Sequence, residues 1–363
     1  MKILLVAGAR PNFMKIAPIV RALGAKRHEV SWKLVHTGQH YDDVMSGSFF
    51  DELRIPEPDC FLNAGSGSHA VQTARIMVEF EKVCRKENPD IVVVVGDVNS
   101  TLACSIVAKK QGARVAHVEA GLRSRDMSMP EEINRIITDA VSDYLFVTEK
   151  SGVENLRGEG KDEGKIHFVG NVMIDTLRYH AGEGSRVRAS GHAGETPYAV
   201  LTLHRPSNVD CKESLRGILR AVVAISREMP IVFPVHPRTD ERIRAFGLEV
   251  VFVGARVKTL PPLPYLEFLA LWKDAALVLT DSGGLQEETT ALGIPCLTLR
   301  DNTERPVTVR EGTNTLAGTS ETSILAAYDA FRNGCSKAGR VPPELWDGRA
   351  AERIVAILVG GER

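Results

Sequence analysis

Short runs of β-branched and aliphatic residues alternate with segments of helical periodicity along most of this chain. Some runs, such as Ile91–Val95, are apolar at every position, as expected for strands of a parallel sheet that is covered on both faces. This alternation predicts an α/β fold built from doubly wound parallel sheets. We expect strands at Lys2–Ala7, Val30–His36, Ile91–Val95, Arg114–Glu119, Tyr144–Val147, Ile166–Val169, Tyr198–Leu203, Ile231–Val235, Glu249–Val253, Ala276–Thr280 and Cys296–Leu299.

The length of 363 residues predicts about two domains. A segment without periodicity, Ala181–Pro197, is rich in Gly, Ser, Glu and Arg and reads as an exposed connection. We therefore expect one Rossmann-like domain over residues 1–169 and a second over residues 170–347. Residues 348–363 carry an apolar stripe that suits a helix docking back on the first domain. Two such domains would face each other across a cleft, with ligands beyond the carboxyl ends of the strands.

Composition narrows the function classes. The 45 Lys and Arg residues nearly balance the 46 Asp and Glu residues, so the chain lacks the basic excess of a general nucleic-acid binder. The apolar strand-like runs are far shorter than the ~20 residues of a membrane helix. Met1 and Lys2 lead directly into a strand-like run, and the six cysteines form no C-x-x-C pair. We therefore expect a cytoplasmic protein with buried free thiols, no membrane partner and no nucleic-acid partner.

The first predicted strand runs into a glycine turn at Gly8 and then a helix. Backbone N–H groups at such a turn can bind an anion, and Arg10 and Lys15 add two cations nearby. The segment is not a Walker loop, because no Gly-Lys-Ser/Thr follows. A plain strand-to-helix turn with solvated charges is the alternative.

Three acidic residues stand at predicted strand ends or helix starts. Asp97 follows the buried run Ile91–Val95, and it could instead cap a helix beginning near Thr101. Glu119 ends the next strand, where a carboxylate is costly unless it is paired or used. Carboxylates that converge on one cleft are candidates for proton transfer. No His-x-x-x-His or paired Asp spacing supports a metal site, so we expect no metal.

Glu131, the third acidic residue, has a competing structural explanation. Ser128 and Glu131 have the spacing of a capping box, with Pro130 in the first helical turn. From spacing alone we favour the cap, although capping and catalysis are compatible. The residues that follow provide an apolar stripe for this helix, at Ile133, Ile136, Ile137 and Ala140.

The second half of the chain places cations at equivalent strand ends. His204-Arg205 and His236 each follow a predicted strand, and together they suggest a cationic wall. Ser282, Gly283 and Gly284 begin a helix after another strand. The amide groups of such a turn and the serine hydroxyl suit a diphosphate. Glu288, one helical turn on, can accept two hydrogen bonds from a ribose diol. An ordinary helix cap with solvated acids is the alternative.

Taken together, these motifs closely resemble the non-hydrolysing UDP-N-acetylglucosamine 2-epimerase family, which has a GT-B-like fold. The resemblance covers nearly the whole chain in the right order. It is carried by the segments beginning at Gly8, Thr37, Gly96, His117, Pro130, Gly170, Thr202, His236, Asp281, Thr303 and Glu311.

The resemblance implies an isomerase that inverts C2 of UDP-GlcNAc to give UDP-ManNAc. UDP is eliminated across C1–C2, and it is added back to the other face of the 2-acetamidoglucal intermediate. By motif match, the acid, base and other catalytic roles fall to Asp97, Glu119, Glu131 and His204. The implied UDP-sugar ligands are Arg10, Lys15, Arg135, His236, Ser282, Gly283, Gly284 and Glu288, the last of these on the ribose. The resemblance implies no cofactor and no metal, and it implies a homodimer.

The chain departs from the family pattern in three places. Ser207 stands where a Glu commonly follows the His-Arg pair, and Val307 stands where another Glu is common. Residues 41–45 lack the second Gln that accompanies an allosteric UDP-GlcNAc site.

Several other functions stay open at this point. Within the family, the sugar could be a UDP-2,3-diacetamido-uronic acid. The chain could also be a hydrolysing epimerase, a glycosyltransferase of the same fold, or a nucleotide-sugar sensor without turnover. An NAD-dependent enzyme is disfavoured, because the G-x-G-x-x-A sequence at Gly65 does not follow a clear strand.

Overall fold

The computed structural model describes residues 1–38, 50, 53–183, 197–335 and 337–360. It divides into two compact units, Met1–Thr176 with Glu344–Arg363, and Leu177–Pro343. The sequence places these divisions at residues 169/170 and 347/348. Each unit is an α/β unit around a parallel sheet, and the predicted fold class is confirmed.

The first unit contains a seven-stranded sheet in the order β3-β2-β1-β4-β5-β6-β7. All its strand pairs are parallel, so every strand presents its carboxyl end at the same edge. The order reverses between β1 and β4, where ligands bind in sheets of this kind. Its strands are β1 (Lys2–Ala7), β2 (Ser31–His36), β3 (Cys60–Phe61), β4 (Ile91–Val95), β5 (Arg114–Val118), β6 (Tyr144–Val147) and β7 (Ile166–Phe168).

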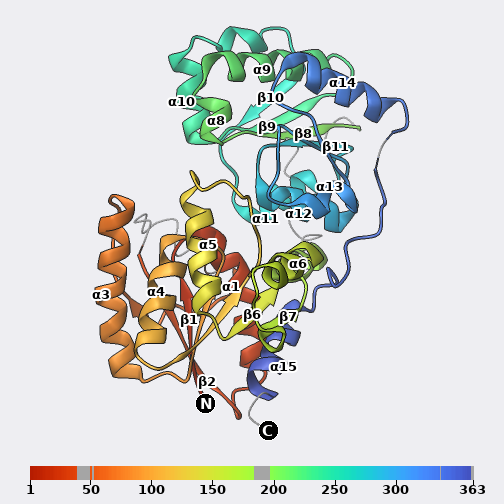
Figure 1. The fold of residues 1–363 in the computed structure, drawn as a ribbon. Coiled ribbons are helices and arrows are strands. Elements are labelled where there is room, and N and C mark those ends of the chain that lie inside the picture. The colour runs from red at the N-terminus through yellow and green to blue at the C-terminus, as the bar shows by residue number, and fades with distance from the viewer. Residues whose placement is uncertain (39–49, 51–52, 184–196, 336, 361–363) are drawn as a thin grey trace. The chain divides into compact units, whose positions relative to one another are not determined.

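Helices cover both faces of this sheet. The helices α3, α4 and α5 pack side by side in one layer, whereas α15 packs against α1 in the other, as the adjacent blue and red ribbons in Figure 1 show. The bounds are α1 (Arg10–Gly24), α3 (His69–Glu87), α4 (Asn99–Lys110), α5 (Pro130–Val141), α6 (Lys150–Gly158), η1 (Glu163–Lys165) and α15 (Ala350–Gly360). The helix α7 (Val172–Glu183) begins in the first unit and continues into the second.

Two features anchor the C-terminal helix α15 to the first unit. The carboxylate of Asp175 accepts hydrogen bonds from the Ala350 and Ala351 amides at 3.1 and 2.7 Å. Gly170 adopts a φ of +88°, and a Cβ there would lie 2.1 Å from the carbonyl oxygen of Leu345. Only glycine fits this close approach.

The second unit repeats the same topology in the order β10-β9-β8-β11-β12-β13, again with all strands parallel. Its strands are β8 (Ala199–Thr202), β9 (Ile231–Pro234), β10 (Val257–Leu260), β11 (Leu277–Thr280), β12 (Cys296–Thr298) and β13 (Asn314–Leu316). Its helices are α8 (Pro206–Val209), α9 (Lys212–Ser226), α10 (Pro237–Ala245), η2 (Glu249–Phe252), α11 (Tyr265–Trp272), α12 (Gly283–Leu292), α13 (Pro306–Arg310) and α14 (Glu321–Arg332).

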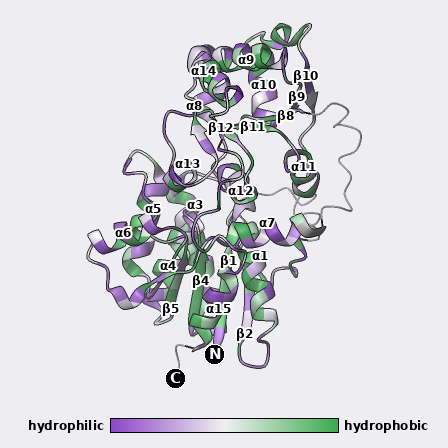
Figure 2. Cartoon of the chain, turned by 90° about the vertical axis from the view of Figure 1, so that its right-hand side faces the viewer, coloured by the Kyte–Doolittle hydropathy of each residue, from purple (hydrophilic) through white to green (hydrophobic). Residues whose placement is uncertain are grey.

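The apolar runs form the centres of both sheets. All five residues of β4 and all four residues of β11 are buried. Figure 2 shows the hydrophobic strands β1 and β4 lying between helices of mixed polarity. Burial on both faces explains why these strands carry no alternation of polar and apolar residues.

Some local predictions were wrong. The expected strand Glu249–Val253 is the 3-10 helix η2, and the edge strand of this sheet is Val257–Leu260. A short apolar run does not distinguish a strand from a helical turn, and Val250 and Val253 are exposed. The short strands β3 and β13 escaped prediction because each has only two or three residues. All six cysteines are free, but Cys211 and Cys335 are exposed.

Candidate functional site

The turn after β1 is held by Asn12. Its Oδ1 accepts the Gly8 and Ala9 amides at 3.1 and 2.9 Å, and its Nδ2 donates to the carbonyl of Val95 at 3.2 Å. The amides that the sequence assigned to an anion are therefore bonded within the protein. The expectation for the Arg10 side chain lies outside the described part of the structure. Asn12 ties β1 to β4 at the point where the strand order reverses.

Lys15 and Glu119 form a buried ion pair at this point. The Nζ–Oε2 distance is 2.5 Å, and the two residues are 8% and 3% exposed. Glu119 has a φ of +73°, which is unfavourable for a residue with a side chain. Its Oε1 is buried without a hydrogen-bond partner among the described residues. A strained backbone and an unsatisfied carboxylate oxygen at one residue are typical of functional sites.

Asp97 follows β4 and lies beside Arg135 of α5. Its Oδ2 accepts from Arg135 Nε at 3.1 Å and pairs with Nη2 at 2.9 Å. The alternative that Asp97 caps a helix is wrong, because α4 begins at Asn99 with Val98 in the capping position and no side-chain cap. Gly96 directly precedes Asp97, and its position also shows where Glu119 lies. A Cβ at Gly96 would lie 3.0 Å from Lys15 Nζ and 3.7 Å from Glu119 Oε2.

Glu131 lies half-buried in the first turn of α5, but the expected capping box is absent. The helix begins at Pro130 with Met129 in the capping position, and the Ser128 hydroxyl donates to Asp126 instead. The neighbouring Glu132 makes the anchoring contacts. It is 1% exposed, accepts the amides of Ser124 and Arg125, and pairs with Arg135 Nη1 at 2.5 Å.

The polarity of α5 is the reverse of the expected one. Its buried residues are Glu132, Asn134, Arg135, Thr138 and Asp139. Ile133 and Ile137, two residues of the predicted apolar stripe, are 40% and 36% exposed. The polar face of α5 serves the loops after β4 and β5, because Asn134 and Arg135 bond Asp97 and Asp139 bonds His117.

In the second unit, His204 follows β8 and is oriented by Asp281, which follows β11. The Asp281 carboxylate is fully buried and accepts the His204 and Arg205 amides at 2.9–3.1 Å. It also lies 2.9 Å from His204 Nδ1. Burial alone would raise the pKa of Asp281, but its contacts with His204 hold that pKa below the usual value. An ionised Asp281 accepts a hydrogen bond from the Nδ1–H of His204, which leaves Nε2 as the ring nitrogen that does not face Asp281.

His236 lies beside His204, with 5.9 Å between the ring centroids. Its Nδ1 accepts the Arg238 amide at 3.3 Å and so caps α10. Partial burial lowers the pKa of His236, and the neighbouring His204 lowers it further. The neutral ring therefore carries its hydrogen on Nε2, which makes that atom a donor.

The N-terminus of α12 has the amide turn that the sequence predicts. Ser282 caps the helix by accepting the Leu285 amide. Beside it, Glu304 pairs with Arg205 and Arg300, each at 2.7 Å. Burial alone would raise the pKa of Glu304, but Arg305, Arg205 and Arg300 hold it far below its usual range. A Cβ at Gly283 would lie 3.1 Å from Glu304 Oε1, so the charged cluster adjoins the helix start.

Glu288 is buried on the same helix, and the Tyr265 hydroxyl donates to its Oε1 at 2.8 Å. Burial raises the pKa of Glu288 to about 7, Tyr265 opposes that rise, and Glu287 adds to it. Glu287 itself is paired with Arg305 at 2.8 Å. Glu288 is therefore a carboxyl whose charge is sensitive to what binds beside it.

Most candidate residues fall into two groups, one in each unit. Lys15, Asp97, Glu119 and Arg135 gather at the carboxyl ends of β1, β4 and β5. His204, His236, Ser282 and Gly283 lie at the carboxyl ends of β8, β9 and β11. Sequence reasoning missed several supporting residues, namely Asn12, Glu132, Tyr265 and Glu304. Only Glu132 had a usable signal, its i,i+3 spacing to Arg135.

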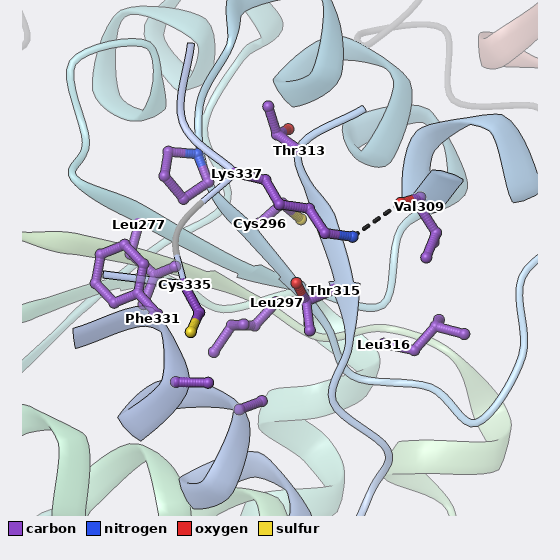
Figure 3. A pocket seen from close by; sticks show the side chains of 13 residues that line it. Leu277, Cys296, Leu297, Val309, Thr313, Thr315, Leu316, Phe331, Cys335 and Lys337 are labelled. Atoms are coloured by element: carbon purple, nitrogen blue, oxygen red, sulfur yellow. Dashed lines mark hydrogen bonds between the residues drawn. The ribbon is translucent and has the colours of Figure 1, made fainter. Parts of the chain in front are cut away.

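A cavity of about 280 Å³ lies elsewhere in the second unit, between β12, β13 and α14 (Figure 3). Its lining is mainly apolar and contains none of the predicted site residues. Lys337 points across it and donates to the carbonyls of Val309 and Asn314. Over the described residues, no three His, Cys, Asp or Glu side chains cluster as metal ligands would. None of the described helices is long and apolar enough to cross a membrane.

The fold and the two residue groups define a two-unit α/β protein with carboxylates at one switch point and cations with helix amides at the other. The sequence profile of a family described as UDP-N-acetylglucosamine 2-epimerase matches residues 22–359. The chain belongs to this family.

Individual members of the family are similar to this chain over their full length. A UDP-N-acetylglucosamine 2-epimerase of Methanocaldococcus jannaschii is 44% identical, with 100% of each chain covered. A UDP-2,3-diacetamido-2,3-dideoxy-D-glucuronate 2-epimerase of Pseudomonas aeruginosa is 40% identical, with 99% of each covered. The crystal structure of the M. jannaschii UDP-GlcNAc 2-epimerase, in complex with UDP-GlcNAc and UDP, superposes with a TM-score of 0.89 over 99% of this chain and 100% of that one.

Proposed function

We propose that this protein interconverts UDP-GlcNAc and UDP-ManNAc by eliminating UDP and adding it back. The observation that carries the proposal is the state of Glu119. This carboxylate is buried and conformationally strained, one oxygen pairs with Lys15, and the other has no partner among the described residues. A family whose reaction moves a proton at C2 requires such a group, and a structural ion pair would not require the strain.

The reaction needs three things from the protein. A base must take the C2 proton, an acid must return it on the other face, and cations must stabilise the departing diphosphate. We assign the proton transfers to Asp97, Glu119 and Glu131. Lys15 holds Glu119 at 2.5 Å and Arg135 holds Asp97 at 2.9 Å. We also assign both cations to the sugar nucleotide as ligands.

We assign UDP to the second unit. The Ser282–Gly284 amides at the start of α12 would receive a phosphate, with His204 and the Nε2–H of His236 as further donors. Glu288 would accept the ribose hydroxyls, and Arg10 completes the expected ligand set. The C2 proton becomes acidic only as the C1–oxygen bond breaks, so the chemistry calls for neither a redox cofactor nor a metal.

The test is incubation with UDP-GlcNAc in D2O. We expect deuterium at C2 of an intact mixture of UDP-GlcNAc and UDP-ManNAc. Accumulation of UDP and free sugar would instead establish a hydrolysing epimerase, and binding without turnover would establish a sensor. Glu163→Gln, which changes a surface ion pair with Arg157, is the matched control and should retain full exchange.

The choice of sugar is tested in the same assay. The relatives at 44% identity over the full length are named for UDP-GlcNAc, whereas the 40% relative is named for the diacetamido-glucuronate. We therefore expect faster turnover of UDP-GlcNAc than of a UDP-2,3-diacetamido-uronic acid supplied at equal concentration. The reverse order would reassign the substrate.

We also propose that the protein is a homodimer formed through α5. An exposed apolar face over Ile133 and Ile137 on a helix whose polar residues face inward is unfavourable in water. Met127 is 61% exposed, and Val78, on α3 of the same helical layer, is 57% exposed. A second copy of the same face would cover these residues.

Ile137→Glu should convert the dimer to a monomer in sedimentation velocity. Val250→Glu, at a residue of the second unit that is 72% exposed, is the matched control and should leave the mass unchanged. A monomeric wild-type protein would contradict the proposal. We place the protein in the cytoplasm, where the exposed thiols of Cys211 and Cys335 would stay reduced.

A further inference from the structure

The loop between β4 and α4 is fixed by side chains from other parts of the first unit. Three consecutive carbonyls of this loop, those of Val95, Gly96 and Asp97, accept side-chain hydrogen bonds. The donors are Asn12 at 3.2 Å and Thr101 at 2.8 Å for Val95, His117 at 2.8 Å for Gly96, and Asn134 at 2.8 Å for Asp97. Among these donors His117 alone can carry a charge.

His117 is fully buried on β5, and both of its ring nitrogens face oxygen atoms. Nε2 lies 2.8 Å from the Gly96 carbonyl and Nδ1 lies 2.6 Å from Asp139 Oδ1. A carbonyl oxygen has no hydrogen to donate, so Nε2 must carry one. The protonation state of the ring then depends on whether Asp139 is ionised.

Asp139 has the surroundings of an ionised carboxylate. Besides His117, its Oδ2 accepts the Gly121 amide at 3.1 Å and pairs with Arg123 at 2.7 Å. Burial alone would raise the pKa of Asp139, but His117 and Arg123 bring it below the usual value. An ionised carboxylate only accepts hydrogen bonds, so Nδ1 of His117 must also carry a hydrogen.

The resulting charges alternate along a chain whose side chains are buried at Arg123, Asp139 and His117 and which reaches the surface at Glu159. Glu159 pairs with Arg123 at 2.7 Å, Arg123 with Asp139, and Asp139 with His117, which ends at the Gly96 carbonyl. A positive His117 leaves no uncompensated charge in this chain. The hydrogen bonds of its two ring nitrogens, which both face oxygen atoms, therefore determine the charge of His117.

We propose that His117 is held as an imidazolium that fixes the Gly96 carbonyl and thereby positions the carboxylates of Asp97 and Glu119. The effect of His117 on the reaction rate rests on the proposed function, whereas the protonation state of His117 does not. Gly96 has a φ of +68°, and a Cβ there would lie 3.0 Å from Lys15 Nζ and 3.7 Å from Glu119 Oε2. It also directly precedes Asp97. A displaced Gly96 peptide would therefore move both carboxylates, and a displacement of about 1 Å in such groups lowers a rate by about 100-fold.

The first experiment is 15N NMR of the full-length protein labelled at histidine, at pH 7.5. We expect a hydrogen on both ring nitrogens of His117 in the wild type. In Asp139→Asn the side-chain amide donates to Nδ1, so we expect that nitrogen to lose its hydrogen while Nε2 keeps its own. A wild-type His117 without a hydrogen on Nδ1 would overturn the proposal, whether or not the protein is an epimerase.

The second experiment compares rates of epimerisation. His117→Phe keeps the ring volume but removes the bond to Gly96, and we expect kcat to fall about 10–100-fold with KM within about threefold. Asp139→Asn keeps that bond through a neutral His117, and we expect a loss of less than about fivefold. His167→Phe, on the half-buried edge strand β7, is the matched control and should be unchanged.

A purely structural role predicts a different pattern. His117→Phe would then lower the folded fraction and leave the kcat of the folded molecules within twofold of the wild type, and that result overturns the positioning role. If His117→Phe does not fold, the proposal is decided by the NMR spectra of the wild type and of Asp139→Asn, together with the rate of Asp139→Asn. Results that differ from those expected above overturn it. A wild type that exchanges no C2 proton would refute the proposed function while the spectra still report on His117.

Discussion

Glu288→Gln separates stability from ligand binding in the second unit. Glu288 is 5% exposed and accepts one hydrogen bond from Tyr265. Burial raises its pKa from 4.5 to about 7. At about 1.4 kcal/mol for each pH unit between these values, the ionised carboxyl destabilises the folded protein by about 3 kcal/mol. Glutamine removes this charge and still accepts from Tyr265.

The sign of the pH dependence follows from the raised pKa of Glu288. Below about pH 4.5 the group is protonated in both the folded and unfolded protein, so it has no net effect. Between pH 4.5 and about 7 only the unfolded protein ionises freely, and stability falls until the full penalty is reached above pH 7. The glutamine variant has no such dependence. We expect Glu288→Gln to exceed the wild type by about 3 kcal/mol at pH 8 and by less than about 1 kcal/mol at pH 5.

Urea unfolding at both pH values measures the free energy of unfolding, and titration calorimetry at pH 8 measures UDP binding. We expect UDP to bind the variant about 10–100-fold more weakly, because hydrogen bonds to a charged acceptor contribute about 1.5–3 kcal/mol. Glu267→Gln, at an exposed position of α11, controls for the loss of one carboxylate and should change neither quantity. A stability difference that is equal at pH 5 and pH 8 would refute the burial argument, and unchanged UDP affinity would refute the ribose assignment.

Three further changes test other parts of the structure. Gly170→Ala should lower the unfolding temperature by more than Gly247→Ala in differential scanning calorimetry. Both positions have positive φ, but only Gly170 has an atom, the Leu345 carbonyl oxygen, within reach of the new Cβ; equal losses would contradict this. Glu119→Gln should lower kcat by about 10²–10⁴-fold while UDP affinity stays within about threefold, and an active variant would remove Glu119 from the mechanism. His236→Phe should weaken UDP binding about tenfold through loss of the Nε2–H donor, and unchanged calorimetric affinity would refute that assignment.

The sequence predicts the architecture because the relevant signals are local. Ile91–Val95 is apolar throughout, and the burial of all five residues follows from its place in the middle of a parallel sheet. The same logic places Asp97 and Asp281 at strand ends, since the polar residue after such a run begins the loop. The failure at Glu249–Val253 has the same origin, because its run of four apolar residues also fits a helical turn on the surface of the core.

The sequence does not predict which site residues pair with each other, because the pairs form between distant parts of the chain. Lys15 and Glu119 are 104 residues apart, and Asn12 reaches Val95 across 83 residues. No periodicity or spacing reports such pairs. The polarity of α5 was misjudged for a related reason, since the periodic stripe at Ile133 and Ile137 is real but does not face the core of its own unit. Periodicity identifies an apolar face and leaves open what covers it.

Several positions where local rules fail lie at the candidate site. Glu119 has a backbone conformation that suits glycine, α5 turns a charged face inward, and Glu288 is a buried carboxyl that accepts its hydrogen bond from a neutral group, the Tyr265 hydroxyl. Each arrangement destabilises the folded protein, so we expect each to be retained because it serves the function. A fold under selection for stability alone would replace Glu288 with a neutral residue and relax Glu119. The two sheets repeat one strand order, and Glu119 follows β5 while Glu288 lies on α12, the helix after β11. That location, more than any single motif, argues that the two carboxyls serve chemistry near these strand ends.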